Sequence, residues 1–214
     1  MTGGKLSAAQ VYVGNFASAL GELTVTNDAQ VVISSTLYCA NASNSVGRLL
    51  VGGNAKVKAA SFAGGGGMVA DGLVSVFDDA HLEINGSSQL GYNTWARQEL
   101  RLRGRADVGP ASENAGFKHY LGYSWGSTGV VDVADAARFH TAGDFYMGWS
   151  NKAYGELRVA GDAKVSNAYS YYVGYGEGSS GRFIVDDRAE VRGTCCYIAK
   201  SDGNATVTNA LVQV

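Results

Sequence analysis

Two groups of acidic residues lie at neighbouring positions of successive sequence repeats, as acid–base hydrolysis would require. Asp132 and Glu156 form one group, and Asp162 forms the other with Asp186 or Asp187. Enzymatic hydrolysis of glycosidic bonds uses two carboxyl groups, either about 5 to 5.5 Å or about 6.5 to 9.5 Å apart. Both groups adjoin arginines or lie in expected turns, which favours a solvated polar face. We therefore expect no catalytic residues and no enzyme.

The three histidines do not predict a metal site. His81, His119 and His140 fall in different phases of the repeat, so stacking of repeats is not expected to gather them as zinc ligands. The calcium-binding nonapeptide Gly-Gly-x-Gly-x-Asp is absent, and no Ser-His-Asp spacing supports nucleophilic catalysis. The sequence predicts neither a metal nor a cofactor.

The three cysteines do not predict a disulfide. By repeat phase Cys39 and Cys196 lie six coils apart, roughly 29 Å at about 4.8 Å per strand, which is beyond disulfide reach. Cys195 and Cys196 are neighbours whose side chains should point to opposite faces of a strand. We expect buried, unreactive thiols.

Aromatic residues give the clearest signal for binding. Six tyrosines occupy one repeat position, two residues before a turn Gly or Ala, and should stack as an outward ladder: Tyr12, Tyr38, Tyr120, Tyr146, Tyr172 and Tyr197. A second set stands one step past that turn: Tyr92, Tyr123, Trp149 and Tyr175. Such rows could bind an extended glycan or another protein. Alternatively, the rings only stabilise and cover the sheet.

The repeat that defines these positions is about 26 residues long and reads Gly-x-Leu-x-Val-x-x-x-Ala-x-Val. Its marker alanines are separated by 26, 25, 26, 31, 26 and 26 residues: Ala29, Ala55, Ala80, Ala106, Ala137, Ala163 and Ala189. Alternating apolar residues and regularly placed glycines at this period predict an all-β fold, a β-solenoid of about eight coils with three strands per coil. Because a solenoid grows along one axis, residues 1–214 are expected to form a single domain.

The period of two also assigns the inward side chains of the Leu-x-Val strand: Leu23, Val25, Leu49, Val51, Val74, Val76, Leu100, Leu102, Val131, Val133, Leu157, Val159, Phe183 and Val185. The marker Ala and the apolar residue two positions later should also point inward. A further inward column comprises Val13, Cys39, Leu90, Leu121, Met147, Val173 and Ile198. Turns before the marker, such as 26–28, 52–54, 77–79 and 160–162, carry Asn, Asp and Gly, which tolerate a left-handed backbone.

Two segments depart from the repeat. Residues Gly64 to Gly67 are four consecutive glycines where other coils have aromatic and aliphatic residues, which predicts a thin or mobile wall. Residues 109–116 are inserted relative to the other coils and contain the only proline. Insertions in solenoids form loops on one face, often the binding face.

Composition excludes several classes of partner. The net charge is −2, 17% of the residues are charged, and no run of like charges occurs. Nucleic acid and anionic membranes are therefore disfavoured partners. No segment is apolar enough to insert into a membrane, and the N-terminus lacks the apolar core of a signal peptide.

A Tyr-x-Gly segment followed by the Leu-x-Val pattern resembles the passenger repeats of bacterial autotransporter adhesins. The clearest example is Tyr146-Met-Gly148, then Gly155-Glu-Leu-Arg-Val, then Ala163-Lys-Val. The resemblance covers nearly the whole chain and implies a right-handed parallel β-helix. It also implies an extracellular or cell-surface location, with this chain as a segment of a longer exported protein.

The sequence thus favours a structural and adhesive surface scaffold that presents the aromatic ladder and the 109–116 loop. Expected partners are a glycan or a cell-surface protein, and the uncapped coils predict either a longer native context or end-to-end self-association. The alternatives are a β-helix that binds or degrades polysaccharide, as a lyase or hydrolase, and a self-assembling filament subunit.

Overall fold

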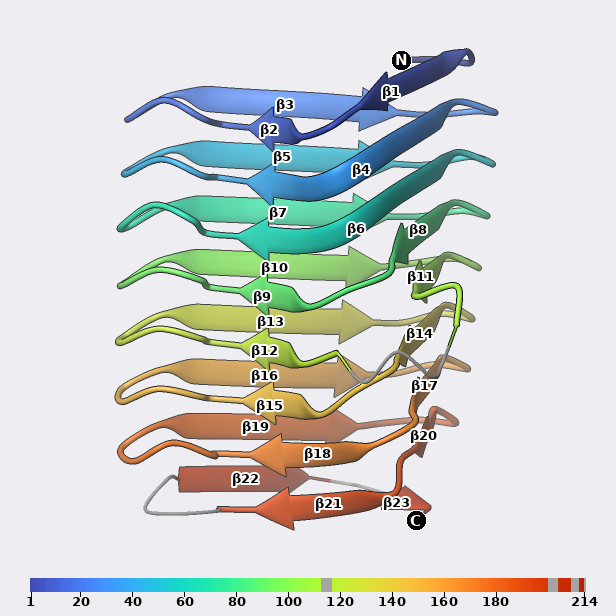
Figure 1. Cartoon of the computed structure of the whole chain (residues 1–214). Coiled ribbons are helices and arrows are strands. Elements are labelled where there is room, and N and C mark those ends of the chain that lie inside the picture. Colours follow the sequence, from blue (N-terminus) through green and yellow to red (C-terminus); the bar gives the residue numbers. More distant parts are fainter. Residues whose placement is uncertain (113–116, 200–203, 209–211, 214) are drawn as a thin grey trace.

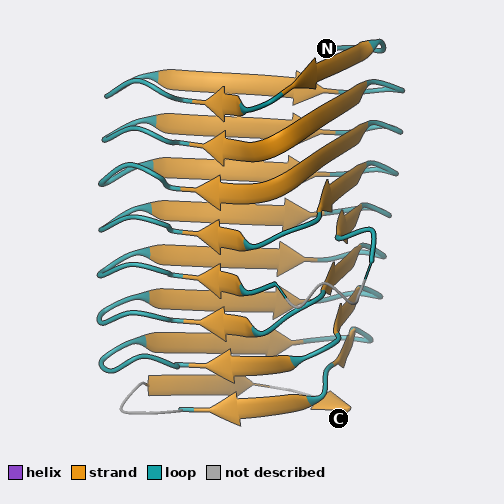
Figure 2. Cartoon of the chain, in the orientation of Figure 1, coloured by secondary structure: helices purple, strands orange, loops and turns teal. Residues whose placement is uncertain are grey.

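A computed structural model describes residues 1–112, 117–199, 204–208 and 212–213 of the chain. It is a parallel β-solenoid of about seven turns, and no helix occurs among these residues (Figure 2). In Figure 1 the chain descends from its N-terminus, passing to the right along the rear sheet and to the left along the front one. This winding is right-handed (Figure 1), as the resemblance implies.

The first wall is an eight-stranded parallel sheet made of the Leu-x-Val segments. Each strand pairs in register with the equivalent strand of the next coil, so Leu157 lies opposite both Val131 and Phe183. Equivalent apolar residues therefore form continuous columns. The strands are β3 (Leu20–Val25), β5 (Val46–Val51), β7 (Asp71–Val76), β10 (Arg97–Leu102), β13 (Thr128–Val133), β16 (Tyr154–Val159), β19 (Ser180–Val185) and β22 (Asn204–Thr208).

The remaining strands form one larger parallel sheet, bent between its two parts. From β7 to β21 each coil contributes two separate strands to it, which confirms three strands per coil there. In the two preceding coils these strands are fused into β4 (Gln30–Cys39) and β6 (Lys56–Gly64), with a register shift between Ile33 and Thr36.

The marker-alanine part of the larger sheet contains β1 (Lys5–Ala8), β8 (His81–Ile84), β11 (Asp107–Gly109), β14 (Arg138–Thr141), β17 (Lys164–Asn167), β20 (Glu190–Arg192) and β23 (Val212–Gln213). The tyrosine part contains β2 (Val11–Val13), β9 (Ser88–Leu90), β12 (His119–Leu121), β15 (Phe145–Met147), β18 (Ser170–Val173) and β21 (Cys195–Ile198). The two parts place their outward side chains on different faces of the rod.

The core follows the expected period of two. All seven marker alanines are buried, and the inward residues of the first wall from Val25 to Val185 are buried as well. Two expected core residues differ. Leu23 is only partly buried because β3 is an edge strand of its sheet, and Ile198 is 54% exposed because β21 is an edge strand of the larger one. An edge strand is covered by a neighbouring coil on one side only.

The glycine-rich coil is filled from its neighbour, so the expected thin wall is wrong at Gly64. Gln98 occupies the register position that holds Gly72 and Gly129 in the two adjacent coils, and its side chain is fully buried. A Cβ placed on Gly64 would lie 2.4 Å from the Gln98 side chain. The long glutamine therefore occupies the space that an aliphatic residue fills in other coils.

The three cysteines are free thiols. Cys39 is buried, and burial raises the pKa of its thiol to about 12, as expected for an unreactive core residue. Cys195 and Cys196 are only partly buried, which corrects the expectation for these two. None of the residues that the structure describes belongs to a helix able to cross a membrane.

Candidate binding surface

The expected tyrosine ladder is present in two pieces. Tyr12 and Tyr38 stack with ring centroids 4.6 Å apart and planes 4° from parallel. The second piece runs through Tyr120, Tyr146, Tyr172 and Tyr197, with centroid separations of 5.2, 4.7 and 4.9 Å. Between the pieces the same register position holds Ala63 and Gln89, which cannot continue the stack.

In the longer ladder the faces of the inner rings are covered by the neighbouring rings. Tyr120 and Tyr146 are only 8% and 5% exposed, whereas Tyr197 at the end of the ladder is exposed. Burial, followed by the nearby Asp144 carboxylate, raises the pKa of Tyr146 well above its ordinary value. Its hydroxyl donates to Asp144 Oδ2 at 3.2 Å. The interior of the ladder therefore contributes rigidity.

The second aromatic row packs against the ladder. Tyr92 stacks on Tyr123 at 5.6 Å, and Trp149 stacks on Tyr175 at 4.7 Å with planes only 2° apart. The rows meet edge to face, as where Trp149 contacts Tyr146 at 4.8 Å and 76°. We call these ten aromatic residues of the two rows the aromatic wall.

A tight turn brings the two rows together. Gly148 separates Met147 from Trp149 and has φ of +72°, a backbone region that favours glycine. A Cβ there would lie 2.5 Å from the Ser180 carbonyl oxygen of the next coil. Gly122 and Gly174 repeat the turn with φ of +67° and +64°.

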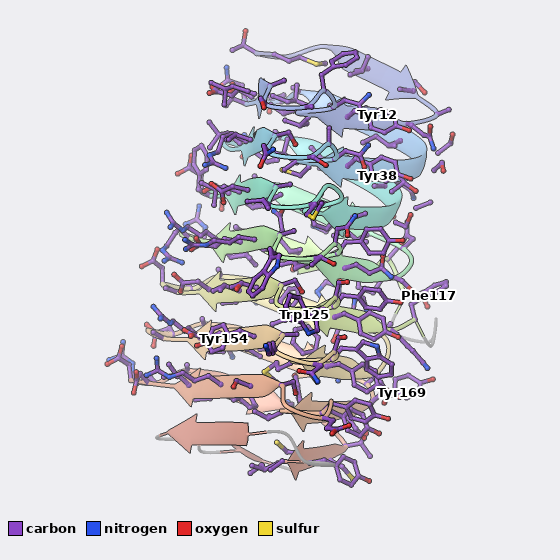
Figure 3. All side chains as sticks on the ribbon, turned by 90° about the vertical axis from the view of Figure 1, so that its left-hand side faces the viewer. Tyr12, Tyr38, Phe117, Trp125, Tyr154 and Tyr169 are labelled. Carbon is purple, nitrogen blue, oxygen red and sulfur yellow. The ribbon has the colours of Figure 1, made fainter. Side chains whose placement is uncertain are left out.

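A third aromatic cluster, which the sequence analysis missed, lies at the corner that leads into the first wall. It comprises Met68, Val69, Trp95 and Trp125, all exposed, and we call it the tryptophan corner. The two indole centroids are 4.6 Å apart with planes at 80°, and Lys152 Nζ lies 4.9 Å from the Trp125 ring. Figure 3 faces this corner and shows Trp125 at its turns, with Tyr12 and Tyr38 on β2 and β4 nearer the N-terminus. Trp95 lies two residues before β10 and Trp125 lies three residues before β13, and this shared position is the signal that could have found them.

The first acidic group is bound by arginines. Asp132 pairs with Arg103 at 2.5 Å, and Glu156, whose side chain is 3% exposed, pairs with Arg158 and accepts from the Tyr154 hydroxyl. In register Asp132 lies opposite Arg158 rather than opposite Glu156. Burial and the Glu156 carboxylate raise the pKa of Tyr154 to about 12. The two acids thus belong to an ion-pair network on the outer face of the first wall.

The second acidic group belongs to turns. Asp162 accepts two hydrogen bonds from Arg188, at 2.6 and 2.8 Å, and this guanidinium lowers the pKa of the Asp162 carboxyl. Asp187 caps the backbone N–H of Gly161 at 3.1 Å, one coil earlier. Asp135 caps Gly104 in the same way at 2.8 Å. The arrangement is that of a repeated structural turn.

Two of the three histidines contact the same carboxylate, although they lie in different phases of the repeat. His81 Nδ1 lies 3.1 Å and His140 Nδ1 3.5 Å from the two oxygens of Asp107. Hydrogen bonds from His140 and His81 lower the pKa of the Asp107 carboxyl strongly. His140 Nε2 also lies 2.9 Å from the carbonyl oxygen of Pro110. In the described part of the chain no three His, Cys, Asp or Glu residues are placed to hold a metal ion.

His119 is instead a core residue. Its Nδ1 lies 2.8 Å from Ser88 Oγ, and burial lowers the pKa of the imidazole to about 4. Its Nε2 and the Thr141 hydroxyl have no hydrogen-bond partner among the described atoms. Both side chains line a small internal cavity of about 20 Å³ beneath Gly109 and Pro110.

The inserted segment begins beside this cavity. Residues 109–112 leave β11, and the Ala111 N–H donates to Asn85 Oδ1 at 2.9 Å. With the contact between His140 and Pro110, this bond ties the start of the insertion to the marker-alanine side of the rod. Residues 113–116 of the expected loop lie outside the described residues.

Comparison with protein-family models, curated proteins and solved structures finds no match to this chain. The fold and the surface themselves define a class, a parallel β-solenoid repeat protein with aromatic clusters along one side.

Proposed function

We propose that the chain is a non-enzymatic, adhesive β-solenoid scaffold whose aromatic wall binds an extended partner, either a glycan or a surface protein. The observation that carries this proposal is the regular stacking of tyrosines from Tyr120 to Tyr197 along the rod. Rings held by their neighbours lose little freedom when a ligand binds, so the entropic cost of association is low.

The polar chemistry of the surface supports a binding role over catalysis. Asp132, Glu156 and Asp162 are each neutralised by an arginine, and Asp187 caps a turn. A general acid or base needs a proton-transfer position that is open to substrate. We assign these carboxylates to ion pairs and turns that stabilise the surface of the rod, and not to proton transfer.

The resemblance to autotransporter passenger repeats is the ground for proposing that the scaffold works outside the cell, as a segment of an exported bacterial protein. A rod of parallel coils suits this task, because its stiffness carries a binding surface away from its point of attachment.

The test combines binding with turnover. The protein is incubated with immobilised neutral and acidic polysaccharides and with a cell-surface protein extract, and retention is compared for the parent chain and a Tyr92→Leu, Tyr123→Leu double variant. A Tyr169→Leu variant, which removes an exposed ring outside the wall, is the matched control. For at least one of these immobilised partners we expect retention to fall at least tenfold in the double variant alone. Equal retention of all three chains would argue against the wall as the binding surface.

The same polysaccharides are assayed for depolymerisation. We expect no release of reducing ends or unsaturated products. Turnover that disappears in Asp132→Asn or Asp186→Asn would overturn the scaffold proposal in favour of an enzyme.

A further inference from the structure

The tryptophan corner is built on a strained backbone. One residue per coil adopts a left-handed conformation at this corner, with φ between 54° and 64°: Ser18, Asn44, Val69, Trp95, Gly126, Lys152 and Gly178. Gly and Asn take this conformation readily, but it is unfavourable for a β-branched residue such as Val69 and for the bulky Trp95. Strain of this kind persists where it serves a function, so the corner invites a functional explanation.

The side chains at the strained positions are apolar and exposed. Val69 and Trp95 are 54% and 51% exposed, and they adjoin the exposed side chains of Met68 and Trp125. Backbone bonds from Val69 N–H to Thr94 and from Trp95 N–H to Trp125 align these turns in successive coils. An Asn or Gly at either position would relieve the backbone and remove the apolar group.

The two indoles form an L-shaped platform. The Trp95 ring lies over Gly126, where a Cβ would come within 2.6 Å of the indole. One face of Trp95 therefore packs on backbone, and its exposure comes from the opposite face. Trp125 stands at 80° to it, and the Lys152 ammonium lies over the Trp125 ring. A flat ligand can lie on Trp95 with one edge against Trp125.

Charge and area indicate which partner fits. The turn segments 67–69, 93–95 and 124–127 contain no charged residue, and the Lys152 ammonium lies over Trp125, which leaves the Trp95 face for a neutral ligand. The four exposed side chains offer on the order of 400 Å², about half of the ~800 Å² that each partner contributes to a stable protein interface. The corner is therefore too small for a stable protein partner and wide enough for a few sugar units.

We infer that the tryptophan corner binds a neutral polysaccharide, with the apolar C–H face of one pyranose ring on Trp95 and its edge against Trp125. The ring hydroxyls then remain in water, as expected for an open site. This inference deepens the proposed adhesive function and rests on it, since it assigns a ligand class to a site beside the aromatic wall.

The test is a substitution that relieves the backbone strain at position 95. Trp95→Asn places a residue that accepts the left-handed backbone at the centre of the site. The parent chain and this variant are titrated with oligosaccharides of β-1,4-glucan, β-1,3-glucan, chitin and mannan, and binding is measured by calorimetry and tryptophan fluorescence. We expect at least one of these neutral ligands to bind, and Trp95→Asn to weaken that binding tenfold or more. Its thermal midpoint should equal or exceed that of the parent chain.

Controls separate this inference from the broader proposal. Tyr169→Ser, which removes an exposed ring elsewhere, should leave binding unchanged, and the Tyr92→Leu, Tyr123→Leu variant should keep neutral-sugar binding at the corner. The inference is overturned if none of the four neutral ligands binds, or if Trp95→Asn binds as tightly as the parent. Adhesion through the aromatic wall would survive either result, provided that retention still depends on Tyr92 and Tyr123.

Discussion

Single residues decide how well the coils of this solenoid fit together, and Gln98 is the clearest example. Its register position holds glycine at Gly72 and Gly129, yet its side chain fills the space left open at Gly64. The repeat alone shows two separate departures, a missing aliphatic residue and a glutamine in a glycine column. Only three-dimensional packing shows that one compensates for the other.

We therefore expect Gln98→Gly and Gly64→Ala to be strongly coupled. Gln98→Gly should lower the free energy of unfolding by roughly 2 kcal/mol, because it opens a cavity in the core. Gly64→Ala alone should also destabilise, since its Cβ would lie 2.4 Å from Gln98. Added to Gln98→Gly, the same alanine should instead stabilise. Chemical denaturation of the three variants measures the coupling, and additive effects would contradict the packing described here.

His119 gives the fold a dependence on pH. Burial lowers the pKa of the imidazole from 6.5 to about 4. Between these two values His119 is protonated in the unfolded chain but neutral in the folded chain. Stability should fall by about 1.4 kcal/mol per pH unit between these values, a total of roughly 3 kcal/mol at pH 4. Above pH 6.5 the residue is neutral in both states and contributes no slope.

The measurement is the free energy of unfolding from pH 7.5 to 4, compared between the parent chain and His119→Phe. The variant retains a ring beside Phe145, which His119 contacts at 6.3 Å. It should lose the slope assigned to His119. Parallel pH profiles for the two chains would show that His119 does not titrate as described.

At the scale of elements, residue preferences explain the left-handed turn before each marker alanine but not the left-handed turn at the tryptophan corner. Before the marker alanines, every left-handed position holds Asn, Gly or Asp, as at Asn27, Gly53 and Asp78. The turn composition predicts this corner correctly. At the tryptophan corner the same backbone occurs at Val69 and Trp95, at a cost of about 1–2 kcal/mol each. Residue preferences therefore do not predict the left-handed backbone at these two positions.

The strands themselves were predictable because each coil repeats the same alternation of inward and outward residues. The register of Leu157 with Phe183 follows from the repeat alone. The meeting of His81 and His140 at Asp107 does not, because it joins three coils around the inserted segment and depends on side-chain reach across the register. The interruption of the tyrosine ladder at Ala63 and Gln89 is visible in the sequence once the register is known.

At the scale of the whole molecule, a coil contacts mainly the coils before and after it, so stability should be a sum of local terms. Every strand of the first wall pairs only with equivalent strands of adjacent coils. Damage to one coil should then spread by about one neighbour in each direction. In a globular core, the same damage would loosen the whole structure.

Two matched substitutions test this locality. A Cβ on Gly129 would lie 2.5 Å from the Gly122 nitrogen, and one on Gly47 would lie 2.4 Å from the Ala40 nitrogen, so both clash with backbone. We expect Gly129→Ala to accelerate amide hydrogen exchange around β10, β13 and β16, and Gly47→Ala to do so around β3, β5 and β7. The affected region should move with the substitution, because the clash separates only the coils that touch it. Equal acceleration along the entire rod in both variants would mean that the coils unfold as one unit.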